Sequence, residues 1–420
     1  MLIRTIELIL ANFTYLQLRA KAMLQPEILE KEQAIIPIFR LAFRPFFLLP
    51  ALLSIIAVVI WITVLRGNLQ WQGILPANIW HGHEMIFGFA ASVAIGFLLS
   101  AAQTWTGVRS IHGWKLATMV FFWLAARIAL FSSTPSVLVF AVICEVIWWS
   151  MGISYLAYMV IKSNNRRNLI FIPLLSIIMM LDVATLWLAL MGNPGLASHL
   201  SYGAVFMMAT MVTVVGGRVI PFFTTRALNL PAINGHSVLE RVIALMMAMT
   251  FITFIVSYRF AISELLAGML MVTGCLQIIR MFNWQTVKTA KTPLLWSLHL
   301  SYLNMGIGFI TMGISYFITT ISFSSAIHIV TVGTIGTMII AMMSRVSLGH
   351  TGRALQINTW ISLSFIVLLI ATLVRFLLPT LNLFMSGYIL AASCWALGFT
   401  LFIVYYTPML ITARPDGRSG

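Results

Sequence analysis

Long apolar runs, repeated along the chain, constrain this sequence more than any other feature. Twelve runs of about 20 apolar residues recur between residues 46 and 412, and each is long enough to cross about 30 Å of hydrocarbon. The chain is 60% hydrophobic and 8% charged, with a mean hydropathy of +0.99. It is therefore expected to be an integral membrane protein. The runs lack the ten-residue alternation of a membrane barrel, so helices are predicted.

The expected fold class is all-α, a polytopic membrane protein of about twelve transmembrane helices. The expected spans are 46–66, 79–102, 114–131, 137–161, 169–191, 197–219, 238–257, 261–281, 293–314, 324–345, 357–376 and 384–412. They form one domain over residues 46–412, because the short connections leave no room for a soluble domain. Residues 1–45 are expected to be a cytoplasmic or interfacial segment that starts with an amphipathic helix, and residues 413–420 a cytoplasmic tail.

Basic residues fall mostly at one predicted membrane face. Of the 25 Lys and Arg residues, 21 lie there, and the four at the other face are Arg66, Arg127, Arg259 and Arg375. By the positive-inside rule both termini are cytoplasmic, which requires an even number of spans. The net charge of +15 therefore reports topology within a lipid bilayer and predicts no nucleic-acid partner.

Four histidines stand at the outer ends of expected spans 2, 6 and 10: His81, His83, His199 and His328. Ionisable side chains are costly inside a bilayer and are typical of functional sites. Neutral imidazole is also a common ligand of haem iron and copper. These four residues are therefore predicted to bind a cofactor or metal. The alternative is that they are interfacial histidines near lipid headgroups.

The stretch "IWHGHEMIFGF" (79–89) places two of these histidines two residues apart. On a regular helix, His81 and His83 point roughly 200° away from each other and cannot easily bind one ion together. They are expected to serve two different partners, or to act as one ligand and one supporting donor. Glu84 shares the helix face of His81 and is predicted to orient its ring or to carry protons.

Two further carboxyl groups, Glu145 and Asp182, lie near the middle of expected spans 4 and 5. Each is predicted either to relay protons or to bond to a neighbouring helix. Methionines gather in "MMATM" (207–211) and "MIIAMM" (338–343). Thioethers suit Cu(I), but flexible core filling is the favoured interpretation.

The spacing of spans 2, 6 and 10 suggests three units of four helices. This arrangement is similar to the haem-copper oxidase superfamily, in which histidines near the outer face hold haem and copper. The adjacent His-His pair of that superfamily, and its paired histidines on the tenth helix, are absent from this sequence. Its dinuclear centre is therefore not carried over.

Three cytoplasmic stretches combine arginine with glycine or proline: "FRLAFRPFF" (39–47), "GGRVIPFFTTRAL" (216–228) and "MMSRVSLGHTGR" (342–353). They are predicted either to bind an anion or to anchor helix ends near lipid phosphate. The residues concerned are Arg40, Arg44, Arg218, Arg345, His350 and Arg353. None of these stretches is a Walker or Rossmann motif, so no nucleotide site is expected.

Four motifs together identify a family: "PIFRLAFRPFF", "WHGHEMIFGFAASVAIGFLLSAAQTWTG", "GGRVIPFFT" and "AMMSRVSLGHTGR". In this order they resemble the NnrS family, from about residue 37 to the end of the last span. Members are understood as bacterial inner-membrane proteins of twelve spans that contain haem and copper and are linked to nitric oxide and nitrosative stress. The resemblance implies the same cofactors, ligand and membrane here. It does not say which histidine holds which metal.

Two classes of function follow. The first is a haem- and copper-dependent protein of nitric oxide metabolism, with reductase or other oxidoreductase activity as one form of it. The chain has no CxxCH motif, so a quinol or a cytochrome partner would have to supply electrons. The second is a twelve-span transporter or metal-handling carrier with intramembrane carboxyl groups. A third is a non-catalytic sensor or assembly factor, of which the sensor is disfavoured because the sequence shows no soluble signalling domain.

Overall fold

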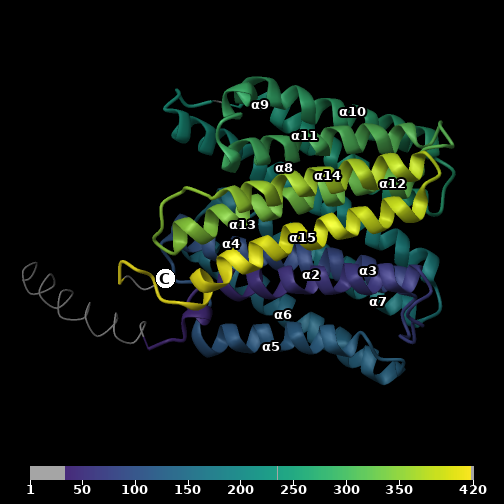
Figure 1. Ribbon diagram of the computed structural model, residues 1–420, viewed down its shortest axis with the longest axis horizontal. Helices are drawn as coiled ribbons and strands as arrows, with labels where there is room; N and C mark the ends of the chain where they lie inside the picture. Colours follow the sequence, from purple (N-terminus) through teal and green to yellow (C-terminus); the bar gives the residue numbers. More distant parts are fainter. Residues whose placement is uncertain (1–33, 234, 418–420) are drawn as a thin grey trace, which may run out of the picture.

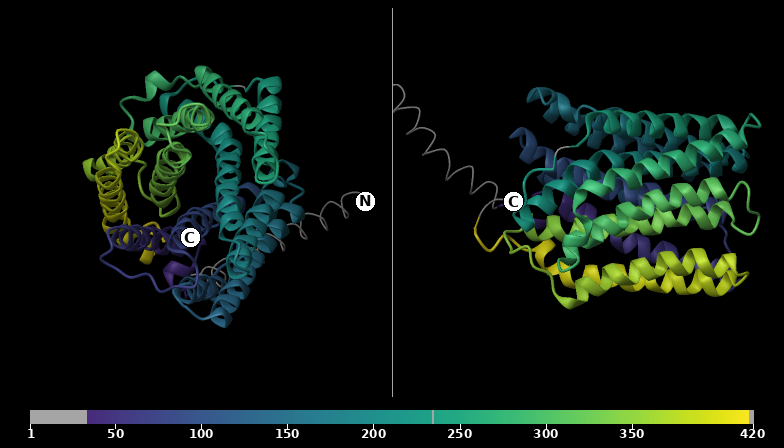
Figure 2. Two further views of the ribbon diagram at one scale, coloured as in Figure 1. Left: turned by 90° about the vertical axis from the view of Figure 1, so that its right-hand side faces the viewer. Right: turned by 90° about the horizontal axis from the view of Figure 1, so that it is seen from above.

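The computed structural model describes residues 34–233 and 235–417, and its helices run side by side along one long direction (Figures 1 and 2). The amphipathic helix expected at the start of residues 1–45 lies outside the described residues. The first half contains α2 (Phe43–Leu65), α3 (Ala77–His83), η2 (Glu84–Ala91), α4 (Ser92–Thr106), α5 (Gly113–Ala129), α6 (Pro135–Lys162), α7 (Phe171–Leu190) and α8 (Pro194–Leu228). The second half contains α9 (Ser237–Ser257), α10 (Ser263–Met281), α11 (Pro293–Ile314), α12 (Phe323–His328), η6 (Ile329–Gly336), α13 (Thr337–His350), α14 (Thr359–Thr380) and α15 (Phe384–Ile411).

The prediction of an all-α membrane protein is confirmed. Two long helices are each built from three consecutive elements, α3–η2–α4 and α12–η6–α13, so the described residues form twelve long helices. Ten of them are long and apolar enough to cross a membrane. The other two are α5, which has 17 residues, and α11, whose interior carries the polar residues Ser297, His299 and Ser301.

Helix ends follow ordinary local chemistry. The side chains of Asn193, Ser322 and Asn358 accept hydrogen bonds from backbone N–H groups in the first turns of α8, α12 and α14, which satisfies donors that have no partner within the helix. Gly107 ends α4 in the left-handed conformation (φ +67°), where glycine has no Cβ penalty.

The helices close on one another around the molecule, because α15 packs against α2. Trp395 of α15 donates a hydrogen bond to Ser54 of α2, and Arg44 donates to the carbonyl oxygens of Leu410 and Thr412. The first described residues and the C-terminal end lie at the same end of the bundle (Figure 1), as an even number of crossings requires.

Three of the candidate spans form the interior of the bundle. In the apolar 18-residue stretches of α3–η2–α4 and α12–η6–α13, 78% of the residues are buried, and in α8 the share is 67%. The remaining candidate spans have at most 44% of that stretch buried. The interior helices are those predicted as spans 2, 6 and 10, and α8 packs against both η2 and η6.

Candidate functional site

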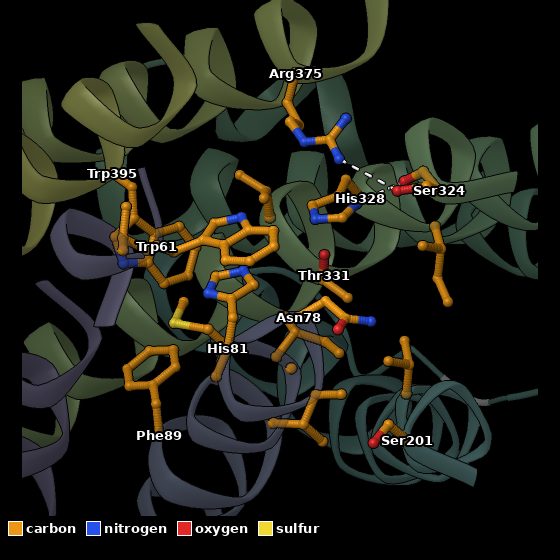
Figure 3. Close-up of a pocket in the computed structure, with 18 of the residues that line it drawn as sticks. Trp61, Asn78, His81, Phe89, Ser201, Ser324, His328, Thr331, Arg375 and Trp395 are labelled. Atoms are coloured by element: carbon orange, nitrogen blue, oxygen red, sulfur yellow. Dashed lines mark hydrogen bonds between the residues drawn. The ribbon is translucent and has the colours of Figure 1, made fainter. Parts of the chain in front are cut away.

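A cavity of about 370 Å³ lies among the interior helices at the end of the bundle where α3 and α12 begin. Its walls come from α2, α3, η2, α8, α12, η6, α14 and α15. His81 and His328 both line it, as Figure 3 shows. Its volume is within the range of cofactor and small-molecule sites. We call it the histidine cavity.

The ring of His81 is fixed by an aromatic neighbour. It stacks on the indole of Trp61, with ring centroids 5.0 Å apart and planes inclined by 7°. The Nδ1 atom of His81 is buried and has no hydrogen-bond partner among the described residues. Buried polar atoms are normally paired, so an unpaired imidazole nitrogen beside a cavity is the arrangement expected of a ligand atom.

His328 approaches the same cavity from α12. Its Nδ1 atom lies 2.5 Å from the carbonyl oxygen of Ser324, so Nδ1 carries the hydrogen and donates it. A hydrogen bond from one ring nitrogen to a carbonyl fixes the tautomer and leaves Nε2 available as a metal ligand. This is the arrangement usual for metal-binding histidines.

Arg375 of α14 brings a positive charge to the histidine cavity, next to His328 (Figure 3). Its guanidinium lies over the ring of Tyr388, 4.5 Å from the centroid, and one nitrogen donates to Ser324 Oγ at 3.4 Å. The other terminal nitrogen, Nη1, is buried without a partner among the described residues. The cavity therefore offers a cation to an anionic group of any molecule bound there.

His83 faces the opposite side of α3, away from the histidine cavity. Its Nε2 atom lies 2.6 Å from a carboxyl oxygen of Asp182 on α7, and its Nδ1 atom 3.2 Å from a carboxyl oxygen of Glu84. All three residues are buried. The expectation that His81 and His83 serve different partners is consistent with this arrangement.

Arg127 of α5 completes a buried group of five ionisable residues, which we call the charged cluster: His83, Glu84, Arg127, Glu145 and Asp182. Arg127 pairs with Glu84 at 3.3 Å and also with Glu145 of α6. Two indoles complete the hydrogen bonding, Trp149 to Asp182 at 2.8 Å and Trp148 to Glu145.

The charged cluster contains more acids than bases. Three carboxyl groups face one guanidinium and one imidazole, so even with His83 protonated one carboxylate has no opposite charge. An uncompensated charge is costly at this depth. One further positive charge, from a proton or a bound cation, would balance the cluster. Three of these residues could hold one metal ion, because each offers a ligand atom within 4.8 Å of the others: His83, Glu145 and Asp182.

Two of the three interior helices that line the histidine cavity change from α- to π-helical geometry directly after a histidine. The π-helix η2 begins after His83, and η6 begins after His328. Such widened turns occur frequently at functional sites. Within η2, Gly88 has a packing role, because a Cβ atom there would lie 2.4 Å from the Arg127 guanidinium and 2.9 Å from Glu84.

His199 lies apart from both groups. Its ring stacks on Phe254 of α9 at a centroid distance of 4.2 Å, and its Nε2 atom donates to the Phe254 carbonyl oxygen at 2.8 Å. It does not line the histidine cavity, although its neighbours Ser198 and Ser201 do. The four predicted histidines are therefore divided: His81 and His328 share a cavity, His83 belongs to the charged cluster, and His199 bonds to a neighbouring helix.

The arginine motifs at the other end of the bundle hold elements together. Arg44 is fully buried and bonds to the end of α15, Arg218 donates to Asn168 at 3.1 Å, and the Arg345 guanidinium lies 3.7 Å from the Phe223 ring centroid. Of the remaining members, His350 of α13 packs against Phe43 of α2. Arg40 and Arg353 donate to the nearby carbonyl oxygens of Ile35 and Thr351.

Sequence reasoning missed two functional candidates, Arg127 and Arg375. The sequence pattern places both only in the small basic set at the outer face. Their positions in the sequence could have identified them. Each lies inside or beside an apolar run, at a membrane face that has few other basic residues. A basic residue there indicates a buried acidic partner or a bound anion.

Comparison with models of protein families gives a match over most of the chain. Residues 37–414 match the sequence model of a protein family described as NnrS protein. No curated protein matches the chain.

Proposed function

The chain belongs to the NnrS family, and from this premise we propose that it binds haem and copper and acts in nitric oxide metabolism and resistance to nitrosative stress. Nitric oxide then binds in the histidine cavity. One observation carries it: His81 and His328, from separate interior helices, line one cavity. Each has a ring nitrogen that is not used in a hydrogen bond within the described residues.

Haem fits the residues of this cavity. Imidazole from His81 or His328 would hold its iron, aromatic side chains such as Trp61 and Trp395 supply apolar walls, and Arg375 would pair with a propionate. When bound, haem supplies an iron that takes nitric oxide. The protein's own residues fix the ligands, because Trp61 holds the His81 ring and the Ser324 carbonyl holds the His328 tautomer.

The charged cluster supports this site from the other face of α3. Its ion pairs fix the turn that carries His81, since His83 lies two residues away and is held by Asp182. We propose that its carboxyl groups, Glu84, Glu145 and Asp182, also hold protons for any reduction of nitric oxide. Electrons for that reaction would come from a quinol or a cytochrome.

Copper has one candidate site in the described residues, formed by His83, Glu145 and Asp182. Imidazole suits copper, but two carboxylates suit harder cations better, and Arg127 already pairs with Glu145. These three residues therefore match copper less well than the residues of the histidine cavity match haem.

The proposed setting is the bacterial inner membrane, with both termini cytoplasmic and the histidine cavity near the periplasmic face. The first and last described residues lie at the same end of the bundle (Figure 1). The arginine motifs lie at that end too, which supports this orientation. The burial of every fourth helix, at the second, sixth and tenth positions, supports a three-by-four arrangement similar to haem-copper oxidases.

Single histidine substitutions test the proposal. We expect His81→Ala and His328→Ala each to lower haem content, measured by Soret absorbance per protein after purification. His199→Ala should retain haem and serves as the matched control, because this histidine lies outside the cavity. Full haem retention in both cavity variants would contradict the site. A wild-type protein without haem, grown with adequate haem supply, would favour the transporter instead.

A further inference from the structure

A second, smaller cavity of about 70 Å³, partly open to its surroundings, lies between α2, η2, α4, α8, η6 and α13. All 17 of its lining residues are apolar. A site for one water molecule needs about 10–15 Å³ and several polar partners. This cavity therefore has room for more than one small molecule, but nothing that would hold water.

The two cavities meet. Ala90, Met208 and Ile335 line both of them, and these residues come from η2, α8 and η6. The widened helices that follow His83 and His328, together with α8, thus form the boundary between the two cavities. A molecule in the small cavity lies against residues that also border the histidine cavity.

Methionines give the small cavity part of its character. Met208 and Met211 come from one methionine cluster of the sequence, and Met338, Met342 and Met343 from another. Thioethers are flexible and polarisable, so this lining adapts to small nonpolar guests. The favoured interpretation of the methionine clusters is flexible filling of the apolar core. They do lie in the apolar core, but they leave this cavity between them.

We propose that the apolar cavity is a binding chamber for small nonpolar gases that supplies the histidine cavity. Polar and charged ligands are excluded by the lining, and a diatomic gas dissolved in the bilayer matches both its size and its chemistry. Dry apolar cavities bind xenon and similar guests, and this cavity has the same apolar lining. The identity of the gas as nitric oxide rests on the proposed function. The affinity of the cavity for nonpolar guests is independent of that function.

Xenon is the probe that reads the cavity directly. In a structure of the whole protein under xenon pressure, we expect xenon density among Met208, Val212 and Ile335. Val212→Phe should displace it. Val214→Phe is the matched control, because Val214 is equally half-buried on α8 but lines neither cavity. Absence of xenon from the wild-type chamber, or its persistence in Val212→Phe, would overturn the proposal.

Gas association with the haem gives the second readout. After flash photolysis of the carbon monoxide complex, Val212→Phe should slow rebinding from solution by about tenfold, roughly 1.4 kcal/mol of added barrier, while Val214→Phe rebinds at the wild-type rate. Equal rates in both variants would show that the chamber does not supply the site. A protein without haem would contradict the proposed function, and the xenon result would then decide this proposal alone.

Discussion

At the scale of single residues, two histidines on one turn are divided between a cavity and a charged cluster. His81 lies against Trp61 and the open space, and His83 bonds to Asp182. Spacing along a helix predicts this division. It does not predict the partners, because Arg127, Glu145 and Asp182 come from three other helices whose order in space is not written in the local pattern.

Breaking the charged cluster should be costly. Arg127→Leu leaves Glu84 and Glu145 buried without their guanidinium, and removing one partner of a buried ion pair typically costs about 3–5 kcal/mol. We expect a clear fall in the melting temperature in detergent. Arg127→Leu combined with Glu145→Leu should recover part of the loss, because one uncompensated charge is removed with its partner.

The control for that experiment is Arg259→Leu, since Arg259 is an exposed basic residue at the same predicted face. Its melting temperature should stay close to that of the wild type. If Arg127→Leu melted at the wild-type temperature as well, the ion pairs would not hold α5, α6 and η2 together.

At the scale of elements, the π-helices η2 and η6 set the rotation of each histidine relative to the helix that follows it. A π-helical turn contains more residues than an α-helical turn. Sequence patterns did not reveal these segments, because both read as continuous apolar runs with α-helical length. The widening depends on packing, such as Gly88 against Arg127 and Gly336 against Trp395.

Shortening a π-helix should move its histidine. Deletion of Ala91, the last residue of η2, rotates His81 by roughly 100° relative to α4, the turn made by one α-helical residue. We expect haem content to fall sharply, as judged by the Soret band. Deletion of Thr320, in an exposed loop before α12, should leave it unchanged. Equal haem content in the two deletions would show that the π-geometry does not position the ligand.

At the scale of the whole molecule, hydropathy was sufficient to predict twelve helices and their order, because bilayer thickness fixes the length of an apolar run. The positions of the histidines marked the second, sixth and tenth helices, and these are the interior helices of the bundle. It could not predict which histidines would share a space. His199 and His328 looked equivalent, yet one bonds to the Phe254 carbonyl and the other lines the cavity.

The central claim is that the histidine cavity holds a haem that takes nitric oxide. The most direct test is an optical spectrum of the purified wild-type protein, oxidised, reduced, and reduced with nitric oxide, with iron and copper measured on the same sample. The account predicts about one or more equivalents of haem iron and a Soret band that shifts on adding nitric oxide. A protein that carries no haem after expression with ample haem, iron and copper, or a Soret band that nitric oxide leaves unchanged, would contradict it.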